Sequence, residues 1–293
     1  MPSLLDMRRR IKSVKNTQQI TKAMKMVAAA KLKRAQDRVT AARPYAQKMS
    51  QVLGNLSARI GDEFSHPLLD ARGDSKYLIV LVSADKGLAG AFNANIIKVA
   101  QGFVTENAGK QIQMMPVGRK GRDFFKRRSM TFLEEYVGMT GKGRVEYDDV
   151  REISQRIIKT FTEDETIDKV FIVFSEFKSV LSQKPVVEQL LPIPRSTDNE
   201  GEASAGRPQA EYIYEQAPAE IFGKLLPKQV ETQVYRAILE SIASEQGARM
   251  TAMDSASKNA GELIGTLTLN MNRIRQAAIT KEIIEVVSGA AAL

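Results

Sequence analysis

Apolar residues near the start of the chain recur every seven residues, in two rows that stay in phase for eight heptads. One row is Leu4, Ile11, Gln18, Lys25, Leu32, Val39, Ala46, Leu53 and Ile60. The other is Met7, Val14, Thr21, Ala28, Ala35, Ala42, Met49 and Leu56. Such rows predict one long coiled-coil helix, with Ser3 and Asp6 as its N-terminal capping box. We expect Pro44 to kink this helix without ending it, because the heptads resume in phase beyond it.

A second long amphipathic pattern fills the C-terminus from about residue 219 to residue 288. Its apolar seam alternates spacings of three and four residues, and it includes Leu239, Ala243, Met250, Met253, Ala260, Ile264, Leu267, Met271, Ile274 and Ala278. Two long amphipathic helices at opposite ends of one chain need partners, and the economical solution is an antiparallel pair with each other. Because the second helix is longer, its apolar tip is expected to project beyond the first.

Between the two helices, strands and helices alternate. Apolar runs at 77–82, 112–117, 131–137, 169–174 and 186–193 indicate strands, and the segments between them have helical spacing. This order predicts a mostly parallel, Rossmann-like sheet. The expected organisation is therefore a coiled-coil helix over 1–60, a Rossmann-like α/β domain over 75–194, a flexible loop over 195–211, and a coiled-coil helix over 212–293.

Charge is distributed unevenly along the 293 residues. The formal net charge is +9, and the first 48 residues hold thirteen Lys or Arg but only two acids. The basic first helix therefore favours an acidic partner, and an acidic protein collar is preferred over nucleic acid or anionic lipid because the cations are spread along the helix. No apolar run is long enough to span a bilayer, and residues 1–6 lack the apolar core of a secretory signal.

The sequence offers few candidate catalytic, cofactor-binding or metal-binding residues. The chain has no Cys and a single His, which leaves no basis for a zinc cluster or a histidine-based triad. The loop at 83–90 lies where a dinucleotide loop would lie, but it lacks the third glycine of that motif. A tight βα turn is the preferred interpretation, and we expect no catalytic residue, no cofactor and no metal. The polar seam residues Gln18, Thr21 and Lys25 leave two interpretations open: a solvated stretch, or a place where a third surface approaches.

Two segments carry a resemblance to a known family. The sequence IKSVKNTQQITKAMKMVAA, residues 11–29, closely resembles the N-terminal signature of the γ-subunit family of F-type ATP synthases. The sequence NRIRQAAITKEIIEVVSGAA, residues 272–291, resembles the C-terminal signature of the same family. Residues 43–46 and 244–253 fit as well, and the resemblance covers nearly the whole chain.

The resemblance implies a non-catalytic rotor shaft, which couples proton-driven rotation of a c-ring to conformational cycling of β catalytic sites. Implied partners are the α and β subunits of the head, the ε subunit and the membrane c-ring. The absence of a transit leader favours a bacterial source, and the resemblance implies a peripheral protein on the cytoplasmic face of the bacterial plasma (inner) membrane. The implied contact residues are Met24, Lys25, Arg249, Arg275 and Gln276 toward β, Val286, Val287 and Leu293 at the bearing tip, and Glu215 in the foot near the c-ring.

Overall fold

Two long helices lie at the ends of the chain, and a four-stranded sheet is formed between them in the sequence. The computed structural model describes residues 3–60, 64–141, 145–164, 166–194 and 217–291. The elements in chain order are α1 (Leu4–Ile60), β1 (Lys76–Val82), α2 (Phe92–Glu106), β2 (Gln111–Val117), α3 (Arg119–Lys126), α4 (Tyr147–Glu163), β3 (Lys169–Phe177), β4 (Gln183–Leu191) and α5 (Pro218–Ala291). The fold class predicted from the sequence is confirmed.

The chain divides into two compact units. The terminal unit contains residues Met1–Ala30 and Arg249–Leu293, and the central unit contains Lys31–Ala248. Both long helices contribute to both units. The expected loop at 195–211 lies outside the described residues.

The seam of α1 follows the predicted heptads. Every fully buried residue of this helix within the described part lies in one of the two predicted rows: Met7, Thr21, Ala28, Leu32, Ala35, Val39, Met49, Leu53 and Leu56. At the N-terminus, Asp6 N–H donates to Ser3 Oγ at 3.1 Å and Ser3 N–H donates to Asp6 Oδ2 at 3.3 Å. The predicted capping box is therefore present, and α1 runs on through Pro44.

The sheet has the order β2-β1-β3-β4. Strand β1 pairs in parallel with β2 and β3, whereas β4 pairs with β3 in the antiparallel direction. The sheet is therefore parallel except at one edge, where β4 is antiparallel to β3. The stretch 131–137, expected to be a strand, makes only isolated bridges to β2 at Phe132 and Tyr136, so that part of the prediction is wrong. These two bridges are too few to add the stretch 131–137 to the sheet as a further strand.

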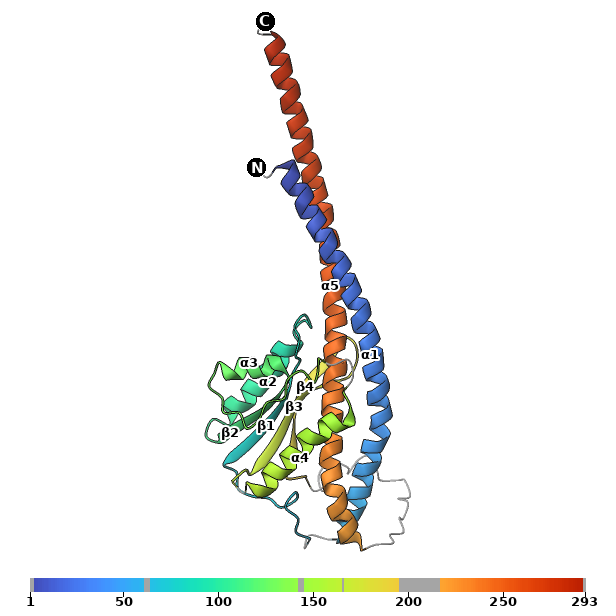
Figure 1. Cartoon of the computed structure of the whole chain (residues 1–293), viewed down its shortest axis with the longest axis vertical. Helices are drawn as coiled ribbons and strands as arrows, with labels where there is room; N and C mark the ends of the chain where they lie inside the picture. The colour runs from blue at the N-terminus through green and yellow to red at the C-terminus, as the bar shows by residue number, and fades with distance from the viewer. Residues whose placement is uncertain (1–2, 61–63, 142–144, 165, 195–216, 292–293) are drawn as a thin grey trace. The chain divides into compact units, whose positions relative to one another are not determined.

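Helices cover both faces of the sheet in the central unit (Figure 1). One face packs on α2 and α3 through a cluster that includes Ile79, Leu81, Ile96 and Phe125. The other face packs on α4 and α5 through a second cluster, and α1 also contributes to this second cluster. Its members include Leu78, Val80, Val150, Ile153, Phe161, Leu226, Val230, Val234, Leu53 and Leu56. Each strand alternates its side chains between these two cores, which explains the continuous apolar run of β1.

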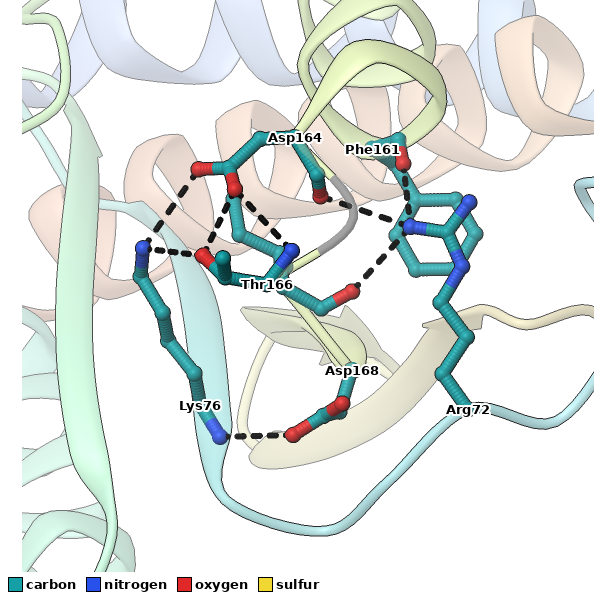
Figure 2. A network of polar contacts seen from close by, with 7 residues as sticks. Arg72, Lys76, Phe161, Asp164, Thr166 and Asp168 are labelled. Atoms are coloured by element: carbon teal, nitrogen blue, oxygen red, sulfur yellow. Dashed lines mark hydrogen bonds and ion pairs between the residues drawn. The ribbon is translucent and has the colours of Figure 1, made fainter.

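A polar network ties the amino edge of the sheet to the end of α4 (Figure 2). Arg72 Nη1 donates to the carbonyl oxygens of Phe161 at 2.6 Å and Asp164 at 3.3 Å. Asp168 accepts from the backbone N–H groups of Ser75 at 2.6 Å and Lys76 at 2.8 Å. The helix end and the strand starts are thereby fixed to one another at the edge opposite the carboxyl ends of β1 and β3.

Candidate functional site

The carboxyl edge of the parallel strands is where a doubly wound sheet binds its ligands. In this chain Asp85 lies at that edge, three residues beyond the end of β1. Its carboxylate accepts from the backbone N–H groups of Gly138, Gly141 and Arg119 at 2.8, 2.8 and 3.0 Å. It also accepts from Thr140 Oγ1 at 2.8 Å. The donors that could bind a phosphate therefore already surround an internal anion.

The charge state of Asp85 follows from these contacts. Burial opposes ionisation, but the hydrogen bonds from Gly138, Thr140, Gly141 and Arg119 outweigh it and hold the pKa of Asp85 below its usual value. A carboxylate that stays ionised would repel a nucleotide phosphate at this position.

The backbone at the same edge is packed closely. Gly118, directly after β2, has φ of +110°, and a Cβ placed on it would lie 2.1 Å from the carbonyl oxygen of Ser83. Ser83 Oγ donates to the Gly118 carbonyl at 3.2 Å and accepts from Gly121 N–H at 2.9 Å. The ends of β1 and β2 are thus fixed together through Ser83, which fits the tight turn expected at 83–90.

Helix α5 occupies the position between β1 and β3 where a doubly wound sheet reverses its strand order. Ser241 Oγ donates to the Val82 carbonyl at 3.5 Å, and Ser244 Oγ donates to the Ser175 carbonyl at 3.0 Å. Helix α5 therefore lies against the carboxyl end of β1 and the neighbouring part of β3, where related folds bind dinucleotides. Within the described ranges, no group of three His, Asp or Glu side chains could hold a metal ion.

The helices of the terminal unit are joined through polar groups. Gln18 Nε2 donates to the Ser257 carbonyl at 3.2 Å, and Lys25 Nζ lies 2.6 Å from Asp254 Oδ1. A Cβ on Gly261 would come within 3.0 Å of Gln18 Nε2. Gln18 and Lys25 are therefore satisfied between the helices, whereas Thr21 Oγ1 donates to the Gln18 carbonyl within α1 at 3.0 Å. The residue number rises from 18 to 25 along α1 while that of the partner falls from 257 to 254 along α5, so the pair is antiparallel.

Several of the residues implied by the resemblance belong to the terminal unit. Met24, Lys25 and Arg249 are half-buried, and Lys25 is committed to its pair with Asp254. Arg275 and Gln276 are exposed on α5.

The implied bearing residues lie at the end of α5. Val286 and Val287 are 71% and 61% exposed, and α5 continues beyond the start of α1 in this unit (Figure 1). The projecting tip predicted from the sequence is confirmed. Leu293 and the foot residue Glu215 lie outside the described residues.

Large exposed apolar side chains are a feature of the terminal unit that the heptad analysis mostly missed. On α1 of the terminal unit, Ile20, Met26 and Val27 are each more than half exposed. On α5 the exposed set is Leu263, Leu269, Ile279, Ile283 and Ile284, in addition to the expected tip residues Val286 and Val287. These side chains lie outside the paired seam, and contiguous exposed apolar surface is typical of a protein contact. Apolar residues at non-seam heptad positions would have indicated this surface.

Known proteins resemble this chain over its full length. The profile of a family described as ATP synthase matches residues 3–293. The ATP synthase gamma chain of Solibacter usitatus is 54% identical over 100% of this chain and 99% of its own. The gamma chain of Heliobacterium modesticaldum is 50% identical and is covered completely, as is this chain.

Solved structures give the same result for the fold. The mitochondrial ATP synthase central stalk and c-ring structure from Tetrahymena thermophila contains a chain that is 26% identical, with a TM-score of 0.60. That match covers 81% of this chain and 99% of the other. A chain of the Euglena gracilis mitochondrial ATP synthase, at 19% identity, shares the fold with a TM-score of 0.67 over 99% of this chain and 94% of its own. With relatives at about half identity along the entire length, the chain belongs to the ATP synthase gamma chain family.

Proposed function

We propose that this chain is the rotor shaft of an F-type ATP synthase. It is a subunit without a catalytic site of its own, and it couples proton-driven rotation of the c-ring to conformational cycling of the β catalytic sites during ATP synthesis. ATP hydrolysis drives the reverse rotation. The observation that carries this proposal is the 54% identity to a bacterial ATP synthase gamma chain over the whole length.

The terminal unit is the part that would turn inside the head. Met24, Lys25, Arg249, Arg275 and Gln276 are proposed to face β subunits within a collar of α and β. The exposed apolar side chains of this unit support such a surrounding surface.

The charge pattern suits a contact that must keep moving. The first 48 residues carry a large excess of cations, and the projecting end of α5 is mostly apolar. Exposed ion pairs are typically worth less than about 1 kcal/mol. Attraction to an acidic collar would therefore guide the shaft without holding it in one angular position.

The end of α5 and the segment around Glu215 have separate proposed roles. Val286, Val287 and Leu293 would form a bearing at the tip, where an apolar end allows sliding contact. Glu215 would lie in a foot that meets the c-ring and the ε subunit. The same proposal assigns segments 1–60 and 212–293 to the shaft, with 75–194 as the Rossmann-like domain.

The proposed location is peripheral, on the cytoplasmic face of the bacterial inner membrane. Among the described residues, every helix is too short in apolar length, or too charged, to cross a bilayer. Attachment would therefore come from the c-ring contact.

The experiment that tests the proposal is co-purification of this chain with α and β subunits, followed by ATPase assays with and without it. We expect a stable complex whose turnover depends on the chain. Failure to assemble with α and β would contradict the proposal.

A nucleotide-binding enzyme is the competing class. Isothermal titration of the full chain with ATP and NAD distinguishes it, because tight binding would favour an enzyme. The contacts of α5 at the carboxyl ends of β1 and β3, and the donors already engaged by Asp85, argue against that outcome. Base-specific DNA binding in a gel shift at physiological salt would favour a nucleic-acid scaffold instead.

A further inference from the structure

The single histidine of the chain, His66, lies in the segment that joins α1 to β1 in the central unit. Its side chain is half-buried. The Phe64 ring stacks on the imidazole, with a centroid separation of 6.2 Å and an interplanar angle of 14°. A Cβ placed on Gly223 of α5 would lie 3.9 Å from His66 Cδ2. The imidazole therefore contacts an aromatic ring and lies close to the backbone of α5.

A hydrogen bond at Nδ1 defines the protonation state that fits this position. Leu68 N–H donates to His66 Nδ1 at 3.2 Å. A ring nitrogen that accepts a hydrogen bond carries no proton, so the imidazole is neutral here and its proton is on Nε2. Protonation of Nδ1 would place two donors against each other, and the bond from Leu68 would be lost.

The backbone around Leu68 connects this bond to the core. Leu68 and Leu69 are buried in the cluster that also contains Phe222 and Leu226 of α5. The Leu68 carbonyl accepts from Ile193 N–H at 2.8 Å. The N–H group that binds the imidazole therefore belongs to a residue that is fixed on its other sides by the core and by the segment after β4.

A second aromatic contact joins the histidine segment to α5. The rings of Phe64 and Phe222 meet edge to face, with their centroids 5.4 Å apart. Phe222 is buried and directly precedes Gly223. The side of the imidazole that faces these groups is apolar, and a charge in apolar surroundings is unfavourable unless it is paired.

The charged groups around the imidazole do little to offset this cost. Asp70 lies on the same segment and accepts from Ser65 Oγ at 2.7 Å. Near the start of α5, Glu220 and Lys224 are engaged with each other at 2.6 Å. Burial lowers the pKa of His66, and attraction to Asp70 opposes only part of that effect. Folding therefore favours the neutral imidazole.

We propose that His66 is a pH-sensitive latch, which fastens the segment between α1 and β1 to the start of α5. At neutral pH the unprotonated Nδ1 binds Leu68 N–H, and the latch is closed. On acidification the imidazolium leaves its site, Leu68 N–H loses its acceptor, and residues 64–70 loosen from α5. The inference does not depend on the rotor function, because every group involved lies within the central unit.

The direction of the pH effect follows from proton binding. The pKa of an unfolded histidine is about 6.5, and the folded pKa of His66 is lower. Between these two values the unfolded chain binds more protons than the folded chain, so the free energy of unfolding decreases as the pH falls through this interval. Asp85 acts only below about 3.9, so the two effects are separable.

The test is NMR of the full chain labelled with ¹⁵N-histidine, in which His66 is the only labelled residue. We expect a titration midpoint below 6.5 and, at neutral pH, the tautomer with its proton on Nε2. Hydrogen exchange at the Leu68 amide is measured in parallel and corrected for its intrinsic pH dependence. The opening constant at Leu68 should rise by up to about tenfold for each pH unit between 6.5 and that midpoint.

Two substitutions separate the titration from the hydrogen bond. His66→Asn places an amide oxygen near the position of Nδ1 but cannot titrate in this range, so the Leu68 amide should stay protected and lose its pH dependence. His66→Leu removes the acceptor, and Leu68 should exchange rapidly even at neutral pH. The control amide is that of Ser83, which donates to the Val117 carbonyl at the opposite edge of the sheet and should not follow the titration.

Three results would overturn the inference. One is a midpoint at or above 6.5. Another is an unchanged pH dependence of Leu68 exchange in His66→Asn, since other groups would then be its source. The third is an equal pH response at Leu68 and Ser83, because the whole unit would then open and His66 would not control a local latch.

Discussion

Lys25 and Asp254 connect the two helices of the terminal unit through an ion pair, with Nζ 2.6 Å from Oδ1. Lys258 on the next turn of α5 contacts the other carboxylate oxygen at 3.0 Å. A polar residue of the α1 seam is thus satisfied by a carboxylate of α5. A polar pair of this kind allows one alignment of two helices and disfavours others.

Substitution of Lys25 should change the titration of its partner. The hydrogen bond from Lys25, followed by that from Lys258, holds the pKa of Asp254 below its usual value. In Lys25→Met that pKa should rise part of the way toward about 3.9, as measured by carboxyl-carbon NMR. Lys22→Met, a lysine of the same helix, is the control. An unchanged titration in Lys25→Met would show that the pair does not form in solution.

Two glycines of α5 should respond differently to alanine. A Cβ on Gly265 meets nothing within 4 Å, so Gly265→Ala should raise the free energy of unfolding by about 0.5–1 kcal/mol through helix propensity. Gly261→Ala should raise the free energy of unfolding by less, because the added Cβ would displace Gln18 from the Ser257 carbonyl. Urea unfolding followed by circular dichroism measures both. Equal increases in the free energy of unfolding in the two variants would mean that the contact between Gln18 and Ser257 does not contribute to stability.

The close approach at the carboxyl edge makes Gly118 a sensitive position. Gly118→Ala places a Cβ 2.1 Å from the Ser83 carbonyl at a φ of +110°, and it should cost at least about 3 kcal/mol. Gly138→Ala is the matched control, because its φ is +85° but its Cβ meets nothing within 4 Å. That variant should lose about 1–2 kcal/mol from backbone strain alone. Similar losses in both variants would contradict the steric explanation.

Asp85 should make stability depend on pH in the acid range. Its folded pKa is lowered, so its contribution is present above the unfolded value of about 3.9 and is lost as pH falls through the folded pKa. Asp85→Asn should reduce the free energy of unfolding at pH 7 by about 1–3 kcal/mol, because it removes an ionised acceptor from several donors. Thermal unfolding from pH 2 to pH 7 measures this. A variant with the full acid dependence of the original chain would exclude Asp85 as its source.

The proposed β contact can be tested at Arg275. Arg275→Ala should lower coupled turnover by up to about fivefold, the effect of one exposed charge contact, while the complex still assembles. Rotational torque and ATP yield of the reconstituted complex are the measurements. Arg273→Ala, a neighbouring exposed arginine of the same helix, is the control. Unchanged torque and yield in the Arg275 variant would remove it from the mechanism.

The sequence alone determined the helical part of this protein. Heptad rows depend on residues a few positions apart, so the buried face of α1 from Met7 to Leu56 could be predicted residue by residue. The capping box at Ser3 and the exposed tip of α5 followed from equally local rules. The family signatures at 11–29 and 272–291 identified the function in the same way, from short contiguous segments.

Tertiary structure decided what depends on distant partners. The stretch 131–137 has the composition of a strand but receives only isolated bridges, because strand formation needs a neighbour to complete its hydrogen bonds. Polar residues of α5 such as Glu240 and Ser244 look like a solvent face, yet they are buried because the helix lies against the sheet on one side and α1 on the other. The donors around Asp85 come from residues more than thirty positions away. Periodicity within one element contains no information about such contacts, and only the folded chain brings them together.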